Sequence, residues 1–232
     1  MSDKLILALP SKGRLMEQCM AAFEVAGLKV RKSGAQRGYR GEVDGFPDIE
    51  VHYVSSSDIA QLLRSGEAHI GITGEDLVRE QIAQAQDRVT FLRPLGFGHA
   101  DVVVAVPDCW IDVRSMADLE LMSMAYRQVH GRRVRVATKY LNITRRFFAS
   151  SGVASYRIVE SLGATEGAPA AGLAELIVDI TTTGATLKAN ALRILDDGVI
   201  LKSQANLIAS KGAPWTEATR AAKMRLMDKF AV

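Results

Sequence analysis

The chain has 232 residues, of which 48% are hydrophobic and 24% charged, close to the average for globular domains. This composition excludes a wholly disordered chain and a fibrous repeat, and the length allows one large domain or two small ones. The formal net charge of +3, from 29 basic and 26 acidic residues, is too small to predict nucleic-acid binding.

The sequence carries no signal for a membrane or for export. Its longest apolar stretches, residues 5–10 and 102–107, fall far short of the roughly 20 residues that cross a bilayer. The first residues lack the basic and apolar segments of a secretory signal, so we expect a cytoplasmic protein. Cys19 and Cys109 are the two cysteines, without metal-ligand spacing, and we expect both to be buried thiols.

Strand-like and helix-like segments alternate through the first part of the chain, which favours an α/β arrangement. The expected strands are residues 5–10, 49–54 and 69–72, followed by expected helices at residues 15–26, 58–65 and 77–85. Asp58 is the expected cap of the second helix, and Gly66 its expected end.

The second part begins after Gly96 and Gly98, a candidate hinge. The expected strands are residues 100–106, 133–137, 156–159 and 176–180, with further extended segments at 199–201 and 205–208. The expected helices are residues 142–150, 186–195 and 216–229. This order predicts two α/β lobes with largely parallel sheets and a ligand cleft between them. Lobe I is expected at residues 1–97 and 190–232, and lobe II at residues 98–189.

The most informative stretch places Asp179 at a strand end, just before the loop of residues 181–187. That loop consists of Thr181, Thr182, Thr183, Gly184, Ala185, Thr186 and Leu187. Its hydroxyls, with the N–H groups of the helix expected to follow, would suit a phosphate. Asp179 could accept hydrogen bonds from sugar hydroxyls or help to hold a metal ion bound to the ligand. Thr and Gly are also ordinary loop residues, so this pattern alone leaves both interpretations open.

Three further loops contain candidate residues. Lys12 and Arg14, on the loop after the first strand, would suit a polyphosphate, although a solvated turn explains them as well. Residues 71–76 form another strand-to-helix turn, whose two acids would repel a phosphate unless Mg²⁺ intervened and could equally cap the helix. Glu166 lies on an irregular loop, where most glutamates face water.

Taken together, these loops resemble the ATP phosphoribosyltransferases that open histidine biosynthesis. The matching stretches are residues 9–15, 58–59, 71–77, 137–140, 166–169, 179, 183–187 and 189–190. The resemblance implies a two-lobed fold like that of type II periplasmic binding proteins. It also implies a pentosyltransferase that joins ATP to 5-phosphoribosyl 1-pyrophosphate (PRPP), with Mg²⁺ carried by the substrates rather than by a protein metal site, and releases pyrophosphate.

The resemblance also assigns roles to single residues. Residues 181–187 would bind the 5-phosphate of PRPP, while Glu166 and Asp179 would face the ribose hydroxyls. Arg14, Glu166 and Asp179 are the expected catalytic residues. The residues expected to contact ATP or pyrophosphate are Lys12, Gly13, Arg37, Gly74, Glu75 and Lys139. Residues 55–57 are serines where many members have arginine and acidic residues, so Arg37 or Arg40 is the expected substitute cation.

Because the sequence ends at Val232, it resembles the short form of the family. The short form implies a homodimer alone and a hetero-octamer with a regulatory subunit related to histidyl-tRNA synthetase. Two alternatives stay open: a pair of lobes that binds a solute without chemistry, and a conventional purine or pyrimidine phosphoribosyltransferase. The second lacks the motifs of the first lobe.

Overall fold

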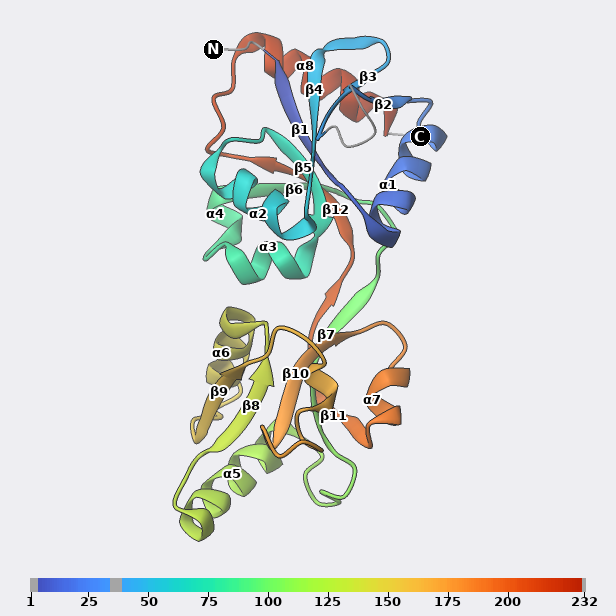
Figure 1. Ribbon diagram of the computed structural model, residues 1–232. Helices are drawn as coiled ribbons and strands as arrows, with labels where there is room; N and C mark the ends of the chain where they lie inside the picture. The colour runs from blue at the N-terminus through green and yellow to red at the C-terminus, as the bar shows by residue number, and fades with distance from the viewer. Residues whose placement is uncertain (1–3, 34–38, 231–232) are drawn as a thin grey trace. The chain divides into compact units, whose positions relative to one another are not determined.

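The computed structural model describes residues 4–33 and 39–230, and its contacts divide the chain into two compact units (Figure 1). Unit 1 comprises Met1–Gly98 and Gln204–Val232, and unit 2 comprises His99–Ser203. Residues 190–203, which the sequence assigned to lobe I, therefore belong to unit 2. The reason is strand pairing within unit 2, described below.

Unit 1 contains a seven-stranded sheet in the order β2-β3-β4-β1-β5-β12-β6. The strands are β1 (Leu5–Pro10), β2 (Val30–Lys32), β3 (Arg40–Val43), β4 (Phe46–Val54), β5 (Ile70–Gly74), β6 (Val89–Pro94) and β12 (Ala205–Ser210). The helices are α1 (Gly13–Val25), α2 (Ser56–Ser65), α3 (Glu75–Gln81), α4 (Ala85–Arg88) and α8 (Glu217–Lys229). β1 runs parallel to β4 and β5, whereas β12 is antiparallel to β5 and β6.

Two hydrophobic clusters hold helices against both faces of this sheet. Leu7 of β1 belongs to the cluster that includes Phe23 of α1 and Leu226 of α8. Ala8, the next residue, belongs to the cluster that includes Ile59 of α2. Successive residues of a strand point to opposite faces, so β1 is buried on both and reads as a continuous apolar run.

Capping of α2 differs from the expectation. Ser55, not Asp58, is the N-cap, because its Oγ accepts a hydrogen bond of 3.1 Å from the Asp58 N–H. The helix ends at Gly66, as expected, with the glycine in the left-handed conformation at φ +80°.

Unit 2 contains a five-stranded sheet in the order β11-β7-β10-β8-β9. The strands are β7 (Ala100–Pro107), β8 (Val134–Thr138), β9 (Tyr156–Glu160), β10 (Leu176–Thr181) and β11 (Leu192–Ser203). The helices are α5 (Met116–His130), α6 (Leu141–Ser150), the short 3₁₀ helix η1 (Thr165–Gly167) and α7 (Ala185–Ala189). β8 is parallel to β9 and β10, but β7 is antiparallel to β10 and β11, so both sheets are mixed rather than largely parallel.

The prediction of a helix at residues 186–195 was wrong for the second half of that range, which is a strand. The helix α7 stops at Ala189, and Leu192 and Ile194 pair with Pro107 and Ala105 of β7. The ladder with β7 outweighs the helical spacing of these apolar residues, and the positive φ of Ala191 (52°) marks the turn between helix and strand.

The two cysteines differ in environment. Cys19 is buried, and burial raises the pKa of its thiol to about 12, which suppresses the reactive thiolate. Cys109 is exposed, so the expectation of a buried thiol there was wrong. In the described part of the chain, no helix has the length and apolar character needed to cross a bilayer.

Candidate active site

Most of the site residues expected in the second lobe line one pocket of about 410 Å³ in unit 2. Its walls come from segments far apart in the sequence: the end of β8, the loop before and within η1, and the end of β10 with the loop that follows. The expected residues on its wall are Lys139, Glu166, Asp179, Thr181, Thr182, Thr183, Thr186 and Leu187. Gly184 and Ala185 belong to the same loop but do not line the pocket.

The threonine-rich loop is organised by its own hydroxyls. Thr181 Oγ1 accepts a hydrogen bond of 2.9 Å from the Gly184 N–H, and Thr183 Oγ1 accepts one of 3.3 Å from the Ala185 N–H. Gly184 has φ +73°, a conformation that favours glycine, and Leu187 is buried beneath the loop. Because α7 is only five residues long, little of the expected helix dipole is available, and the pocket presents mainly hydroxyls.

Asp179 is positioned by the middle of the sheet. β10 lies between β7 and β8, and Asp179 is opposite Val103 of β7. Burial raises the pKa of the carboxyl, and the nearby Glu166 raises it further. The Ile180 N–H, which donates a 2.8 Å hydrogen bond to Oδ1, and Lys139 act in the opposite direction. The carboxylate is therefore in an environment that favours a cationic partner.

Glu166 lies on η1, whose start is fixed by Ala164 in the left-handed region at φ 48°. Thr165, beside it, is buried, lines the pocket and donates a hydrogen bond of 3.0 Å to Ser161 Oγ. Sequence reasoning did not select Thr165. Thr165 is next to Glu166 in the sequence, which could have suggested it, but only the fold around η1 shows that its side chain reaches the pocket.

The expected residues of the first lobe lie in unit 1, at two strand-to-helix turns. Lys12, Gly13 and Arg14 are exposed at the start of α1, and Gly13 has φ +76°. The preceding Ser11 N–H donates a 2.8 Å hydrogen bond to the Val54 carbonyl, which ties this loop to the end of β4. Lys12 is the N-cap residue of α1, and its ammonium, which has no acceptor, cannot cap the helix start.

Gly74 and Glu75 form the corresponding turn after β5. Gly74 is the N-cap of α3, and the Glu75 carboxylate pairs with Arg79 at 2.6 Å, one helical turn further on. This contact gives Glu75 a role on the helix surface. Arg37, also expected near ATP, lies outside the described residues.

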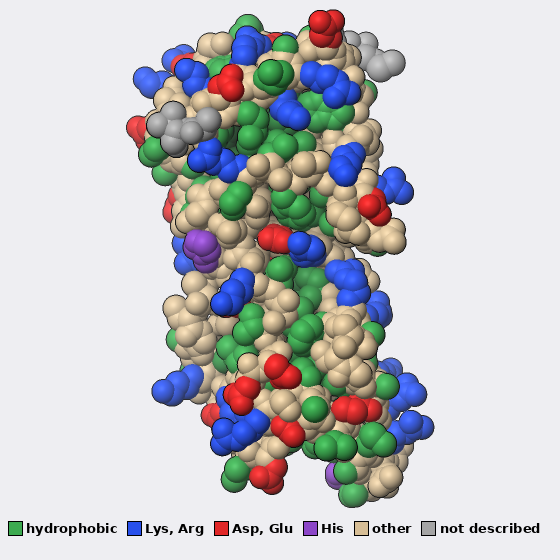
Figure 2. Space-filling view, turned by 180° about the vertical axis from the view of Figure 1, so that it is seen from behind, with side chains coloured by type: hydrophobic (Ala, Val, Ile, Leu, Met, Phe, Trp, Pro, Cys, Tyr) green, Lys and Arg blue, Asp and Glu red, His purple; other side chains and the backbone are tan. Residues whose placement is uncertain are grey.

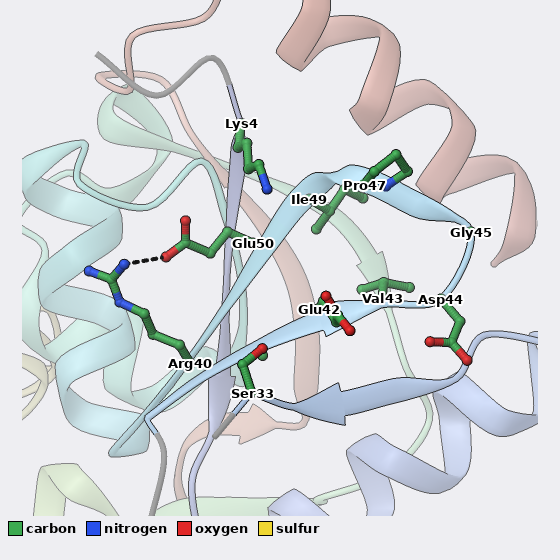
Figure 3. A pocket seen from close by; sticks show the side chains of 11 residues that line it. Lys4, Ser33, Arg40, Glu42, Val43, Asp44, Gly45, Pro47, Ile49 and Glu50 are labelled. Carbon is green, nitrogen blue, oxygen red and sulfur yellow. Dashed lines mark ion pairs between the residues drawn. The ribbon is translucent and has the colours of Figure 1, made fainter. Parts of the chain in front are cut away.

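A second pocket, of about 450 Å³, lies in unit 1 beside β3 and β4 (Figure 3). It contains Arg40, the expected substitute cation, whose guanidinium pairs with Glu50 at 3.0 Å. His52 also contacts Glu50 at 2.9 Å, and this hydrogen bond lowers the pKa of the Glu50 carboxyl. Arg40 is thus paired with a carboxylate of the same pocket.

The side chains around Asp179 offer few ligands for a metal ion. Over residues 4–33 and 39–230, no three His, Cys, Asp or Glu side chains gather into a group that could hold an ion. Glu166 and Asp179 are the two carboxylates of the unit 2 pocket. One or two carboxylates fit a hard cation that arrives with a polyphosphate, because such an ion keeps most of its ligands from water and phosphate.

Comparisons with known proteins agree with this arrangement. The family model described as HisG, ATP phosphoribosyltransferase, matches residues 55–230. An ATP phosphoribosyltransferase of Rhodopseudomonas palustris (strain BisA53) is 61% identical over 231 residues, covering 100% of this chain and 71% of that protein.

Solved structures extend the comparison to the fold. A chain of the ATP phosphoribosyl transferase (HisG:HisZ) complex from Thermotoga maritima has a TM-score of 0.72 and 29% identity, covering 97% of this chain and 95% of that one. An arginine-binding protein mutant from T. maritima has a TM-score of 0.51 at 14% identity, covering 97% of this chain and 89% of that one, which supports the expected likeness to periplasmic binding proteins at the level of fold alone. The chain belongs to the ATP phosphoribosyltransferase family, whose reaction is the first step of histidine biosynthesis.

Proposed function

We propose that the pocket in unit 2 binds the phosphoribosyl group of PRPP during the condensation with ATP. The supporting observation is that Lys139 and Glu166, which are distant in the sequence from Asp179, line the same pocket of about 410 Å³ as Asp179 and five residues of the loop that follows it. Hydroxyl groups of the loop would bind the 5-phosphate, and the two carboxylates would accept hydrogen bonds from the ribose hydroxyls.

In the reaction, a bond forms between N1 of adenine and C1 of the ribose while the bond from C1 to pyrophosphate breaks. Adenine N1 is a neutral nucleophile, so the enzyme mainly needs to orient the reactants and stabilise the charges that develop. Positive charge builds on the ribose ring as pyrophosphate departs. The carboxylates of Asp179 and Glu166 would stabilise that charge, and the raised pKa of Asp179 indicates that its anion gains from such a partner.

Mg²⁺ is the proposed metal, and it would neutralise charge on the departing pyrophosphate. Glu166 and Asp179 are the residues of the pocket that could contact it. We also propose that Lys12, Gly13, Arg14, Gly74, Glu75 and Lys139 serve ATP or pyrophosphate. Among them, Lys12 and Arg14 are exposed cations suited to phosphate oxygens. Both proposed substrates are metabolites of the cytoplasm, where we place the enzyme.

A regulatory partner is the second part of the proposal. The similar T. maritima chain comes from a HisG:HisZ complex. We propose that this chain acts as a short-form catalytic subunit with an equivalent partner, related to histidyl-tRNA synthetase, in a hetero-octamer, and forms a homodimer alone. Light scattering of the chain with and without that partner tests this, since a strict monomer that stays a monomer after mixing contradicts it.

The catalytic proposal is tested by mixing the protein with ATP, PRPP and Mg²⁺ and measuring pyrophosphate release together with the modified adenine. We expect Asp179→Asn to lower turnover by about a hundredfold or more, as for loss of a group that stabilises transition-state charge. Asp228→Asn, an exposed substitution in unit 1, is the control. Equal turnover in both variants would remove Asp179 from the mechanism. Tight PRPP binding without product, both with and without the regulatory partner, would favour a solute-binding protein.

A further inference from the structure

A second pocket of unit 2, separate from the candidate active site, is unusually basic. It has a volume of about 670 Å³, and its wall contains five arginines, Arg132, Arg133, Arg135, Arg145 and Arg157. The other residues of its wall are apolar or aromatic, and none is a carboxylate. A surface that is only solvated usually mixes both signs of charge, so this wall requires an explanation.

The arginines converge on the outer edge of the sheet. Arg132 and Arg133 directly precede β8, and Arg135 of β8 lies opposite Arg157 of β9 in the parallel register. Arg145 comes from α6. β9 is the last strand of its sheet, so the pocket opens to solvent along an edge. Figure 2 shows Lys and Arg side chains gathered along the edge of this unit on which β9 lies.

Only part of this positive charge is neutralised within the protein. Glu175 pairs with Arg132 at 3.0 Å and with Arg135 at 2.7 Å. Within the described ranges 4–33 and 39–230, no hydrogen bond or ion pair engages the guanidinium of Arg133, Arg145 or Arg157. Three uncompensated guanidinium groups around one hollow repel each other, and an anion placed there would relieve that repulsion.

We propose that this arginine pocket is a binding site for a small polyphosphate, distinct from the phosphate loop of the active site. Guanidinium groups bind phosphate oxygens through paired hydrogen bonds, and several such groups match the several anionic oxygens of a polyphosphate. The volume lies in the range of pockets for small ligands. A second copy of the chain paired symmetrically along β9 is disfavoured, because it would place this row of arginines against itself.

The polyphosphate could be free or part of a nucleotide, and the test separates these sources. Binding of sodium tripolyphosphate, ATP and adenosine is measured by calorimetry with the wild-type chain and with Arg133→Gln/Arg145→Gln/Arg157→Gln. The control, Lys29→Gln/Arg64→Gln/Arg88→Gln, removes the same amount of charge from exposed positions of unit 1. The three substituted arginines are exposed, so the fold should persist, and the melting temperature measured with and without tripolyphosphate checks it.

We expect the arginine variant to lose one tripolyphosphate site, with affinity there falling about tenfold or more, while the control keeps it. Tripolyphosphate should raise the melting temperature of the wild type and the control more than that of the arginine variant. Equal affinity for tripolyphosphate and ATP would identify the phosphate chain as the ligand, and tighter binding of ATP would identify a nucleotide. Equal binding by all three proteins, or equal loss in both variants, would overturn the proposal.

Discussion

Glu175 links the start of β10 to β8 in unit 2. Its replacement by glutamine measures how much this link contributes to the free energy of unfolding. The residue directly precedes β10, the strand that carries Asp179. Its carboxylate accepts hydrogen bonds from the Arg135 N–H at 2.7 Å and from the guanidiniums of Arg135 and Arg132. The Glu175 side chain is 11% exposed, whereas the side chains of Arg132 and Arg135 are 46% and 30% exposed, so water screens these contacts in part.

The pKa of Glu175 gives the size of the effect. Burial by itself would raise this pKa, but the hydrogen bonds from Arg135 and Arg132 outweigh burial and lower it from 4.5 to about 2. Because Arg132 and Arg135 are themselves 46% and 30% exposed, water screens these ion pairs, and we expect only about 1 to 2 kcal/mol of folding free energy at neutral pH from this shift. Because the folded-state pKa is the lower one, this stability is present above about pH 4.5 and is lost as the pH falls toward 2.

The assay is urea unfolding of Glu175→Gln followed by the fluorescence of Trp110, in a Trp215→Phe background so that unit 2 alone is reported. Glu160→Gln, an exposed change on β9, is the control. We expect Glu175→Gln to lower the free energy of unfolding by about 1 to 2 kcal/mol at neutral pH, and the difference from wild type to shrink below about pH 4.5. A loss no larger than that of the control, or one independent of pH, would refute the reasoning.

Three other substitutions have defined outcomes. Lys139 lowers the pKa of Asp179, so Lys139→Met should move the acid limb of the kcat/KM profile to higher pH. An acid limb at the same pH in both proteins would show that Lys139 does not act on the carboxylate that controls the rate. Burial lowers the pKa of His69 in the folded chain, so below about pH 6.5 the unfolded chain takes up a proton that the folded chain does not, and unit 1 loses stability. In His69→Gln, the free energy of unfolding should therefore change less between pH 7 and acid pH than in the wild type. Gly66→Ala should lower stability by more than the roughly 1 kcal/mol of backbone strain, because a Cβ there would overlap a neighbouring backbone carbonyl; Gly45→Ala, with φ also +80° but open space, is the control, and equal melting temperatures would contradict the overlap.

The strands that carry the site could be predicted from the sequence. Apart from Asp101 and Asp179, residues 100–106 and 176–180 are apolar and largely β-branched, and they lie in β7 and β10. Asp179 and the threonine loop are adjacent in the sequence, so a binding site for a phosphorylated sugar can be predicted there from the local sequence alone. The family resemblance, the two-lobed fold and the reaction are confirmed by the comparisons, whereas the role of each residue stays a prediction.

Pairing between distant segments could not be predicted. The apolar residues at 192–195 have helical spacing, and only the ladder with β7 makes them a strand. The meeting of Lys139, Thr165 and Asp179 in one pocket likewise depends on how β8, η1 and β10 pack. The arginine pocket could not be predicted either, because its residues are spread over residues 132–157 and converge only where β9 ends the sheet.

The position of β12 has a consequence for biosynthesis on the ribosome. β6 is joined to the rest of its sheet through β12, which lies between β5 and β6 although it is made more than a hundred residues after β6 begins. Every strand of the other sheet has been synthesised by Ser203. Since contiguous segments fold as they emerge, residues 99–203 can mature first, while β5 and β6 keep an unpaired edge until β12 is made and need protection from aggregation until then.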